Sequence, residues 1–385
     1  MIRRGLWCAV LVPLLLILLP FSAHAQEITL PSADEDVPEE LFDLFDALPS
    51  DVRDLLPEKV FSTDRELLGE GVREMSDLSY LLRTLLSIVG LKLGDCVALF
   101  ASVTGLLLIS SVVSALRSSL RSERVARAFS FCSTLVVTLS ILSLMTGALD
   151  ATVSYFSTLN ALTAASIPVM TVLYTLGGNA TAAVASSAGL SVFMTVTEEL
   201  IGKSILPFCG LCSFLAVMRS LDPSIRLGTL LGAIKKHYAT ALTFLTVLLI
   251  AMLSTQTLLA ARGDTVLMRG AKFATGNLIP VVGGSVSELL KTVCAGVGYL
   301  RGAVGLCGTL LLLLTLLPTL VELLLLRLAW QLTASVADLL GCESEKRLLE
   351  EVASLIGYLV AAVSICSSIL LVAFTILTHC ATALG

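Results

Sequence analysis

The residues DCVALFASVTGLLLISSVVSALRSSLRSERVAR (95–127) contain the pattern that decides the fold. Residues 95–116 form an apolar run of about the length that an α-helix needs to cross the hydrocarbon core of a bilayer. The run ends in a short segment with four arginines and one glutamate, namely Arg117, Arg121, Arg124 and Arg127 against Glu123. Because short basic loops stay in the cytoplasm, this segment is predicted to lie inside and the residues before the span outside.

Further apolar runs follow as far as the C-terminus. They cover residues 128–149, 239–260, 302–340 and 352–378, while the stretches between them, 150–219 and 261–301, are apolar but interrupted. The 385 residues are 56% hydrophobic and 14% charged, with a mean hydropathy of +0.93. Soluble domains have about a quarter charged residues. We therefore predict an all-α fold, a polytopic membrane helix bundle over residues 95–385 with six, seven or eight spans.

Residues 1–25 have the three parts of a secretory signal peptide. Arg3 and Arg4 precede an apolar stretch over 6–21, and Ala23-His24-Ala25 forms a small-residue cleavage site. Cleavage there would place the following chain outside the cytoplasm, in agreement with the orientation that the basic segment sets. The alternative is an uncleaved first span, which the two prolines within the apolar stretch disfavour.

Residues 26–94 form an acidic segment that is predicted to be extracytoplasmic. Residues 26–95 hold 17 acidic and 6 basic residues, a net of −11, whereas residues 96–385 carry a net of +4. This acidic excess argues against nucleic acid as a partner, because phosphate neutralisation needs clustered Lys and Arg. Apolar residues at helical spacing over 75–93 predict an amphipathic helix on the membrane surface before the first span.

An internal repeat of about 112 residues is suggested by matched interruptions. Ile167-Pro168-Val169 recurs as Ile279-Pro280-Val281, and Leu206-Pro207 recurs as Leu317-Pro318. The repeat-like units cover about 128–238 and 239–351, followed by a final span at 352–378. Residues 219–238 hold Arg219, Arg226, Lys235 and Lys236 and are predicted to be a second cytoplasmic segment. With basic ends on the same side, the repeats are parallel, and each contains an even number of crossings.

The prolines and glycines in these units predict broken segments. Proline removes a backbone donor, and inside a bilayer the freed groups are tolerated only where protein or water satisfies them. The chain around Pro168, Gly177-Gly178, Pro280 and Gly283-Gly284 is therefore predicted to be broken or re-entrant and to face the interior. The alternative is ordinary loops outside the membrane.

The sequence contains no recognisable catalytic motif, and we predict neither a catalytic residue nor a bound cofactor or metal. It lacks the H-E-x-x-H, G-x-S-x-G and phosphate-binding P-loop patterns. Glu322, Arg327 and Asp338 interrupt the most apolar stretch. Glu322 and Arg327 either pair with another helix or protomer or mark the end of a span. Gly298 and Gly302 form a G-x-x-x-G motif, which predicts close helix packing within the chain or with a partner.

One block is more specific than membrane patterning. The stretch GDTVLMRGAKFATGNLIPVVGG (263–284) resembles a block of the stage III sporulation protein AE family, through Arg269, Ala271, Lys272, Phe273, Gly276, Asn277, Ile279 and Pro280. The order of signal peptide, acidic segment, basic loop and Pro/Gly interruptions is similar as well. We single out Arg269, Lys272, Gly276, Asn277 and Pro280 as a functional motif.

This resemblance implies a membrane component of the channel between mother cell and forespore in endospore-forming bacteria. It implies partners from the same complex, including a separate cytoplasmic ATPase and ring proteins of the intermembrane space. It also places the protein in the mother-cell-derived membrane around the forespore, without enzymatic activity. The residues alone leave a second hypothesis open, a self-contained secondary transporter with two parallel repeats.

Overall fold

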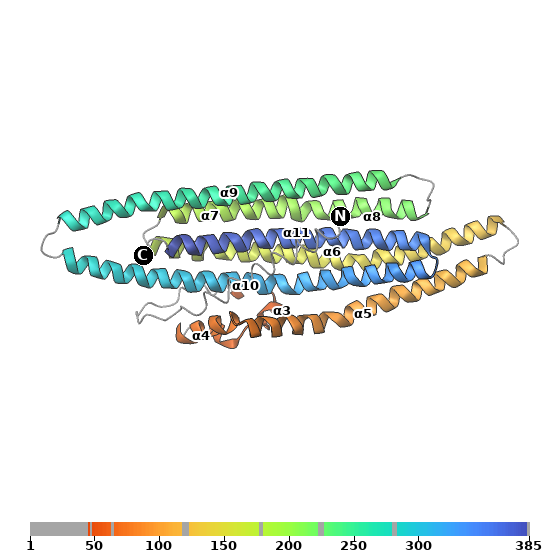
Figure 1. The fold of residues 1–385 in the computed structure, drawn as a ribbon, viewed down its shortest axis with the longest axis horizontal. Coiled ribbons are helices and arrows are strands. Elements are labelled where there is room, and N and C mark those ends of the chain that lie inside the picture. The colour runs from red at the N-terminus through yellow and green to blue at the C-terminus, as the bar shows by residue number, and fades with distance from the viewer. Residues whose placement is uncertain are drawn as a thin grey trace.

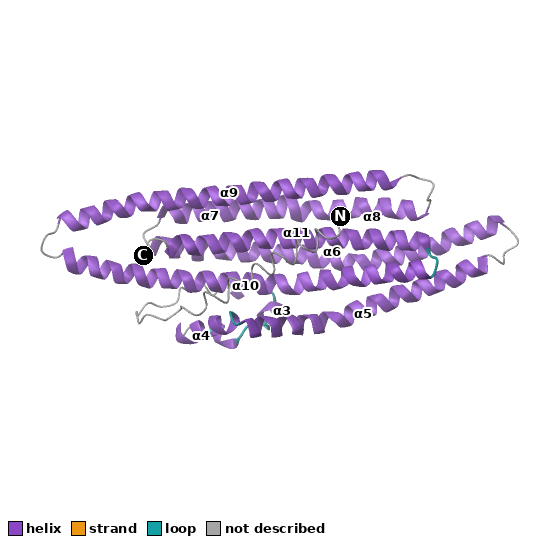
Figure 2. Ribbon diagram, in the orientation of Figure 1, coloured by secondary structure: helices purple, strands orange, loops and turns teal. Residues whose placement is uncertain are grey.

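The computed structural model describes residues 45–46, 48–62, 65–117, 123–176, 180–221, 227–278 and 283–382. Within them the chain forms helices and no strand, which confirms the all-α prediction (Figures 1 and 2). Short elements come first, α3 (Ser50–Arg53), η1 (Glu58–Phe61) and α4 (Arg65–Met75). The bundle follows as α5 (Leu78–Arg117), α6 (Glu123–Leu176), α7 (Ala180–Thr195), η2 (Val196–Gly202), α8 (Lys203–Leu221), α9 (Leu227–Leu278), α10 (Gly283–Leu339) and α11 (Glu343–Thr382).

The long helices run antiparallel along one axis in an elongated bundle (Figure 1). The element η2 is a π-helix that joins α7 to α8, so these three elements make one pass along the bundle. Six stretches of the described chain are long and apolar enough to cross a membrane: Leu78–Val113, Thr134–Val172, Ser187–Ser220, Leu227–Met252, Cys307–Leu339 and Glu343–Leu371. The prediction of a polytopic membrane protein is thereby confirmed.

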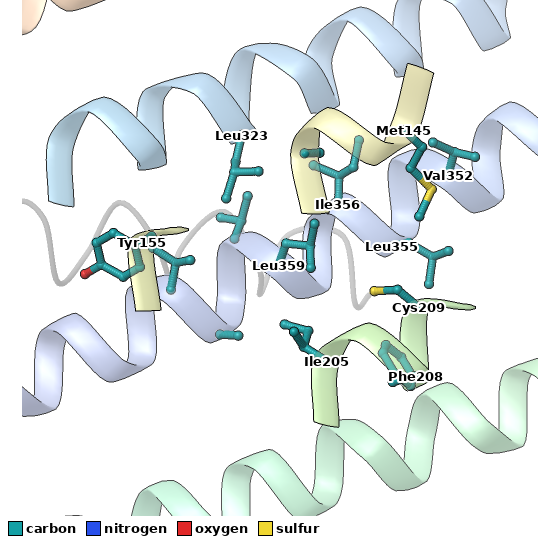
Figure 3. Packing of buried hydrophobic residues seen from close by; sticks show 14 of the residues in the cluster. Met145, Tyr155, Ile205, Phe208, Cys209, Leu323, Val352, Leu355, Ile356 and Leu359 are labelled. Carbon is teal, nitrogen blue, oxygen red and sulfur yellow. The ribbon is translucent and has the colours of Figure 1, made fainter. Parts of the chain in front are cut away.

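Helix α11 occupies the centre and contacts α6, α8, α9 and α10. Its apolar side chains Leu355, Ile356 and Leu359 lie between residues of the surrounding helices, including Tyr155 of α6 and Ile205 of α8 (Figure 3). In a lipid environment apolar burial alone supplies little drive, so close packing of this kind holds the helices together. The absence of charged residues from 352 to 378 follows from this central position.

A second buried cluster joins the acidic segment to the bundle. Val60 of η1 and Met75 of α4 pack with Leu310 and Leu314 of α10 and with Val169 of α6. The amphipathic helix predicted over 75–93 is not separate from the first span, because α5 runs without a break from Leu78 to Arg117. The signal peptide predicted over 1–25 lies outside the described residues.

The prediction of a broken, interior-facing segment at Pro168 is wrong. Helix α6 continues through this residue, and Pro168 is exposed on the outside of the bundle. The loss of one backbone hydrogen bond is tolerated here because Leu162 and Val169, on either side of the proline, are packed into the same buried cluster. Pro207 and Pro318 are likewise within helices.

Helices do end close to the other predicted interruptions. Helix α6 ends at Leu176 and α9 at Leu278, while the connecting residues 177–179 and 279–282, Pro280 among them, lie outside the described residues. Gly283 and Gly284 begin α10. The repeat-like units both contain a long helix followed by a returning helix, but Pro168 lies inside α6 whereas Pro280 comes after the end of α9. The internal repeat therefore stays a prediction.

A tight turn joins α10 to α11. Gly341 has a φ of +72°, the amide of Cys342 donates to the carbonyl of Ala337 at 2.9 Å, and the amide of Gly341 donates to the carbonyl of Asp338 at 3.1 Å. This pattern is a Schellman cap, in which glycine adopts the left-handed conformation that other residues rarely reach. The cap ends α10 and directs α11 back along it.

Candidate functional site

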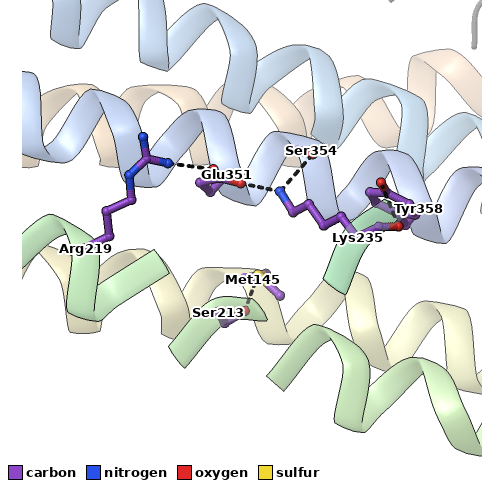
Figure 4. Close-up of polar contacts among 7 residues, drawn as sticks. All are labelled: Met145, Ser213, Arg219, Lys235, Glu351, Ser354 and Tyr358. Atoms are coloured by element: carbon purple, nitrogen blue, oxygen red, sulfur yellow. Dashed lines mark hydrogen bonds and ion pairs between the residues drawn. The ribbon is translucent and has the colours of Figure 1, made fainter. Parts of the chain in front are cut away.

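Three charged side chains from three helices meet inside the bundle. Nη1 of Arg219 on α8 donates to Oε1 of Glu351 on α11 at 3.2 Å, and Nζ of Lys235 on α9 contacts Oε2 of the same carboxylate (Figure 4). The side chains of Arg219, Glu351 and Lys235 are 34%, 18% and 11% exposed. The carboxylate thus links α8 and α9 to α11 in surroundings where an unpaired charge is costly.

Polar and aromatic groups fix the position of Lys235. Its Nζ also donates to Oγ of Ser354 at 3.1 Å, and its backbone carbonyl accepts a hydrogen bond from the hydroxyl of Tyr358 at 3.4 Å. The ring of Phe208 stacks on Tyr238 with 3.8 Å between centroids and meets Tyr358 edge-on at 5.4 Å. These contacts from three helices leave the lysine little freedom to turn away from Glu351.

A second ion pair links α5 to α10. Nζ of Lys92 lies 2.6 Å from Oε2 of Glu322, and both side chains are about one third exposed or less. Five residues further along α10, Arg327 packs over Gly357 of α11, where an added Cβ would lie 3.2 Å from the guanidinium carbon. A side chain at this position would require the arginine to shift by a few tenths of an ångström.

The two ion pairs are offset along the bundle: Glu351 precedes Gly357 by six residues on α11, and Glu322 lies five residues beyond Arg327 in the same direction, roughly 16 Å in all. Gly357 touches Arg327 and is next to Tyr358, which contacts Lys235. The five residues from Arg327 to Glu322 span roughly 8 Å of helix. We refer to this staggered set of charged residues across five helices as the charged waist; it consists of Lys92, Arg219, Lys235, Glu322, Arg327 and Glu351.

The charged waist is suited to fixing the axial register of the helices. Each of its two carboxylates has a cation within hydrogen-bond distance on another helix. Sliding one helix by a single turn, about 5.4 Å, would separate these charges. Within the described ranges, no group of three His, Cys, Asp or Glu side chains is arranged to hold a metal ion.

A buried carboxylate adds a contact between α5 and α11 towards the basic end. Glu345 accepts a hydrogen bond from Oγ of Ser110 at 2.9 Å, and Oγ of Ser111 donates to the carbonyl of Leu340 at 3.4 Å. These bonds hold α5 against the turn between α10 and α11. Asp338, which the sequence singled out, pairs with Lys346 across that turn at 2.6 Å.

The residues of the predicted motif do not belong to the charged waist. Arg269, Lys272, Gly276 and Asn277 are in the final turns of α9, and their side chains fall outside what the structure describes. Pro280 lies outside the described residues altogether. Gly298 and Gly302 are within α10, at positions whose side-chain surroundings are also not described. The roles predicted for these residues therefore stay predictions.

Sequence reasoning found only part of the charged waist. It singled out Glu322 and Arg327 as ionisable groups in an apolar stretch, and the structure pairs Glu322 with another helix, one of the two alternatives considered. It treated Lys235 as part of a basic boundary segment and gave no role to Lys92 or Glu351. An ionisable group within a membrane span needs a partner of opposite charge, and a search for the partner of Glu322 would have directed attention to Lys92.

The bundle and its charged waist define a multi-pass membrane protein in which paired charges cross-link long apolar helices. Comparison with known families gives a narrower result. The model of the family described as "Stage III sporulation protein AE" matches residues 65–381, and the chain belongs to this family. The resemblance found in the sequence is thereby confirmed.

A curated relative agrees with this family. The chain is 24% identical over 213 residues to the stage III sporulation protein AE of Bacillus subtilis (strain 168), a match covering 55% of this chain and 53% of the relative. The chain thus spans about half the length of the curated relative it matches. No solved structure matches the chain. The protein is therefore a multi-pass membrane protein of a sporulation family.

Proposed function

We propose that this protein is a non-enzymatic subunit of a multiprotein transport channel between mother cell and forespore, needed for forespore development. The observation that carries the proposal is the family match over residues 65–381, together with six helices of membrane-spanning length and composition. The protein would reside in the mother-cell-derived membrane around the forespore. Motive force would come from a separate cytoplasmic ATPase, and ring proteins of the intermembrane space would be further partners.

The charged waist supports a role as a fixed framework. Ion pairs from α5, α8 and α9 to the central α10 and α11 tie outer helices to inner ones. A subunit that must hold its place in a larger assembly benefits from such a register. The exported segment and the glycine-rich part of α10 would supply contact surfaces for the partners.

The functional motif in α9 provides the first test. In a sporulating host that carries this chain as its only copy, Lys272→Ala and Asn277→Ala should lower spore yield at least tenfold while membrane insertion stays normal. Lys236→Ala, an exposed lysine on the same helix, is the matched control and should leave the yield unchanged. Full spore yield from both motif variants would count against a role for the block.

Assembly and transport provide the second test. Gly302→Leu should reduce recovery of the other complex components when this chain is purified from sporulating cells, with its own abundance in the membrane unchanged. The competing hypothesis of a secondary transporter predicts that the purified protein alone moves a solute into vesicles. Uptake without partners would overturn the channel-subunit proposal.

A further inference from the structure

Two polar side chains inside the bundle each have an oxygen atom without a hydrogen-bond partner in the described part of the chain. They are Oγ1 of Thr197 in η2 and Oδ1 of Asn160 in α6, and both atoms are shielded from solvent. Thr197 as a whole is fully buried. Both residues lie within stretches long and apolar enough to cross a membrane, Thr134–Val172 and Ser187–Ser220. Bulk water does not supply the missing bonds at such a position.

The hydroxyl of Thr197 differs from those of several other buried threonines. In a helix, threonine commonly satisfies its hydroxyl by donating to the carbonyl of the residue four positions earlier. Bonds of this kind, at 2.7–2.8 Å, are made by Thr152, Thr163, Thr315 and Thr333. Thr197 is in the first turn of the π-helix, and its hydroxyl makes no such bond. This hydroxyl is therefore available to a group outside its own helix.

Two contacts set the register between α6 and the pass formed by α7, η2 and α8, which runs in the opposite direction (Figure 1). Sδ of Met145 on α6 lies 3.8 Å from Oγ of Ser213 on α8. Eleven residues further along α6, Cβ of Phe156 lies 3.9 Å from the position that a Cβ would occupy at Gly202, and Gly202 comes eleven residues before Ser213. The register is therefore constant between these two contacts.

Asn160 and Thr197 are each about one turn from the contact between Phe156 and Gly202. Asn160 follows Phe156 by four residues, so it lies on the same face of α6, about 6 Å further along. Thr197 precedes Gly202 by five residues, one turn of a π-helix, and its carbonyl oxygen lies 3.4 Å from the position of a Cβ at Gly202. Because the two segments run in opposite directions, these steps lead the same way. Asn160 and Thr197 thus lie at one level of the interface between α6 and η2.

The groups at this level suit a water molecule better than a cation. An internal water needs about two to four polar partners, and an amide oxygen with a hydroxyl provides two. A hard cation takes about six oxygen ligands and, inside an apolar bundle, a carboxylate to balance its charge. The carboxylates nearest in sequence to Thr197 are exposed, and one of them, Glu199, pairs with Lys203 at 2.5 Å. The two oxygen atoms therefore fit a small neutral ligand.

We infer that an internal water bridges α6 and η2, donating a hydrogen bond to Oδ1 of Asn160 and accepting one from the hydroxyl of Thr197. Its surroundings are otherwise apolar, since Leu159 and Phe193 belong to the buried cluster around α11. Left without partners in such surroundings, each polar group would lower the folding equilibrium constant roughly 5- to 150-fold. The water satisfies both groups at once and links α6 to the π-helical turn. This site belongs to the single chain and does not depend on the proposed channel role.

The direction of one stability change tests the bridge. Thr197→Val keeps the shape of the side chain, removes a partner of the water, and should lower the folding equilibrium constant of the full chain in detergent about tenfold. Without a bound water, the same change would remove a buried unpartnered hydroxyl and raise the constant. The matched control, Thr152→Val, should change it less, because Thr152 is fully buried and its hydroxyl bonds to its own helix. A gain from Thr197→Val, or a loss no larger than that of the control, would overturn the inference.

Radiolytic oxidation separates a bound water from a direct bond between the two side chains. Hydroxyl radicals that X-rays generate from an internal water oxidise the side chains beside it, so Phe156 and Phe193 should be oxidised although both are buried. This oxidation should disappear in the double variant Asn160→Leu with Thr197→Val. No oxidation in the unsubstituted chain, or equal oxidation in the double variant, would contradict a water at this site.

The salt dependence of unfolding separates a water from an ion. The midpoint of thermal unfolding of the unsubstituted chain should be the same in sodium, potassium and choline chloride at equal ionic strength, because a neutral ligand is common to all three solutions. A midpoint raised by sodium or by potassium alone would assign the site to that ion and overturn the inference of a water. Neither result bears on spore yield.

Discussion

Replacing Glu351 by glutamine removes the carboxylate that Arg219 and Lys235 share. The two cations would remain close together, with Lys235 only 11% exposed and Arg219 about one third exposed. Removing one partner of a fully buried ion pair costs about 3–5 kcal/mol, because it leaves an uncompensated charge. Since Arg219 is partly solvated, we expect a smaller loss in the free energy of unfolding, about 2–3 kcal/mol.

Unfolding of the purified protein in detergent can be followed through the fluorescence of Trp330, which is fully buried in α10. The control is Glu343→Gln, which removes an exposed pair with Arg347 at 3.9 Å and should cost no more than about 0.5 kcal/mol. Adding Lys235→Met to Glu351→Gln should recover part of the loss by removing one excess charge. If Glu351→Gln proves no more destabilising than Glu343→Gln, the charged waist does not hold the helices in register.

Three further predictions concern single positions. Gly341→Ala should lower the free energy of unfolding by about 1–2 kcal/mol, because φ at this residue is +72°; chemical unfolding measures it. Gly357→Val should cost about 1–3 kcal/mol in the same assay, since its Cβ would lie 3.2 Å from the Arg327 guanidinium carbon. The carboxylate of Asp77 caps the start of α5 by accepting hydrogen bonds from Ser79, and these bonds lower its pKa. The cap therefore stabilises the helix fully above the ordinary carboxyl pKa of about 4, and this stabilisation is lost as the pH falls through the lowered pKa. Hydrogen exchange in the first turn of α5, corrected for intrinsic rates, should rise over that range and should be raised at all pH values in Asp77→Ala.

Much of the helical content could be predicted because hydropathy marks lipid-facing segments well. The stretch 128–149 is the first part of α6, but the sequence did not predict the continuation to Leu176. That continuation buries Leu159, Thr163 and Ser166, where threonine and serine bond to carbonyls of their own helix and so tolerate burial. The interruptions in this apolar stretch hid a packed helix. Pro168 was misinterpreted because its neighbours on both sides are held by tertiary contacts.

The charged waist was only half predictable, because its pairs join residues distant in sequence. Glu322 and Lys92 are 230 residues apart, and no local pattern links them. An isolated charge in an apolar stretch signals that a partner exists without saying where it lies. Lys235 was hidden for the opposite reason, since a cluster of basic residues resembles a membrane boundary even when one member turns inward to a partly buried carboxylate.

The π-helical element η2 has a consequence for the helix that contains it. Each π turn holds one residue more than an α turn, so Val196–Gly202 absorbs a surplus residue between Phe193 and Ile205, both of which face the core. Winding all of these residues as a regular α-helix would rotate one half about 100° relative to the other, whereas deleting one residue would give an unbroken α-helix with both halves in place. The π-helical element therefore allows both flanking helices to keep their buried faces toward the core.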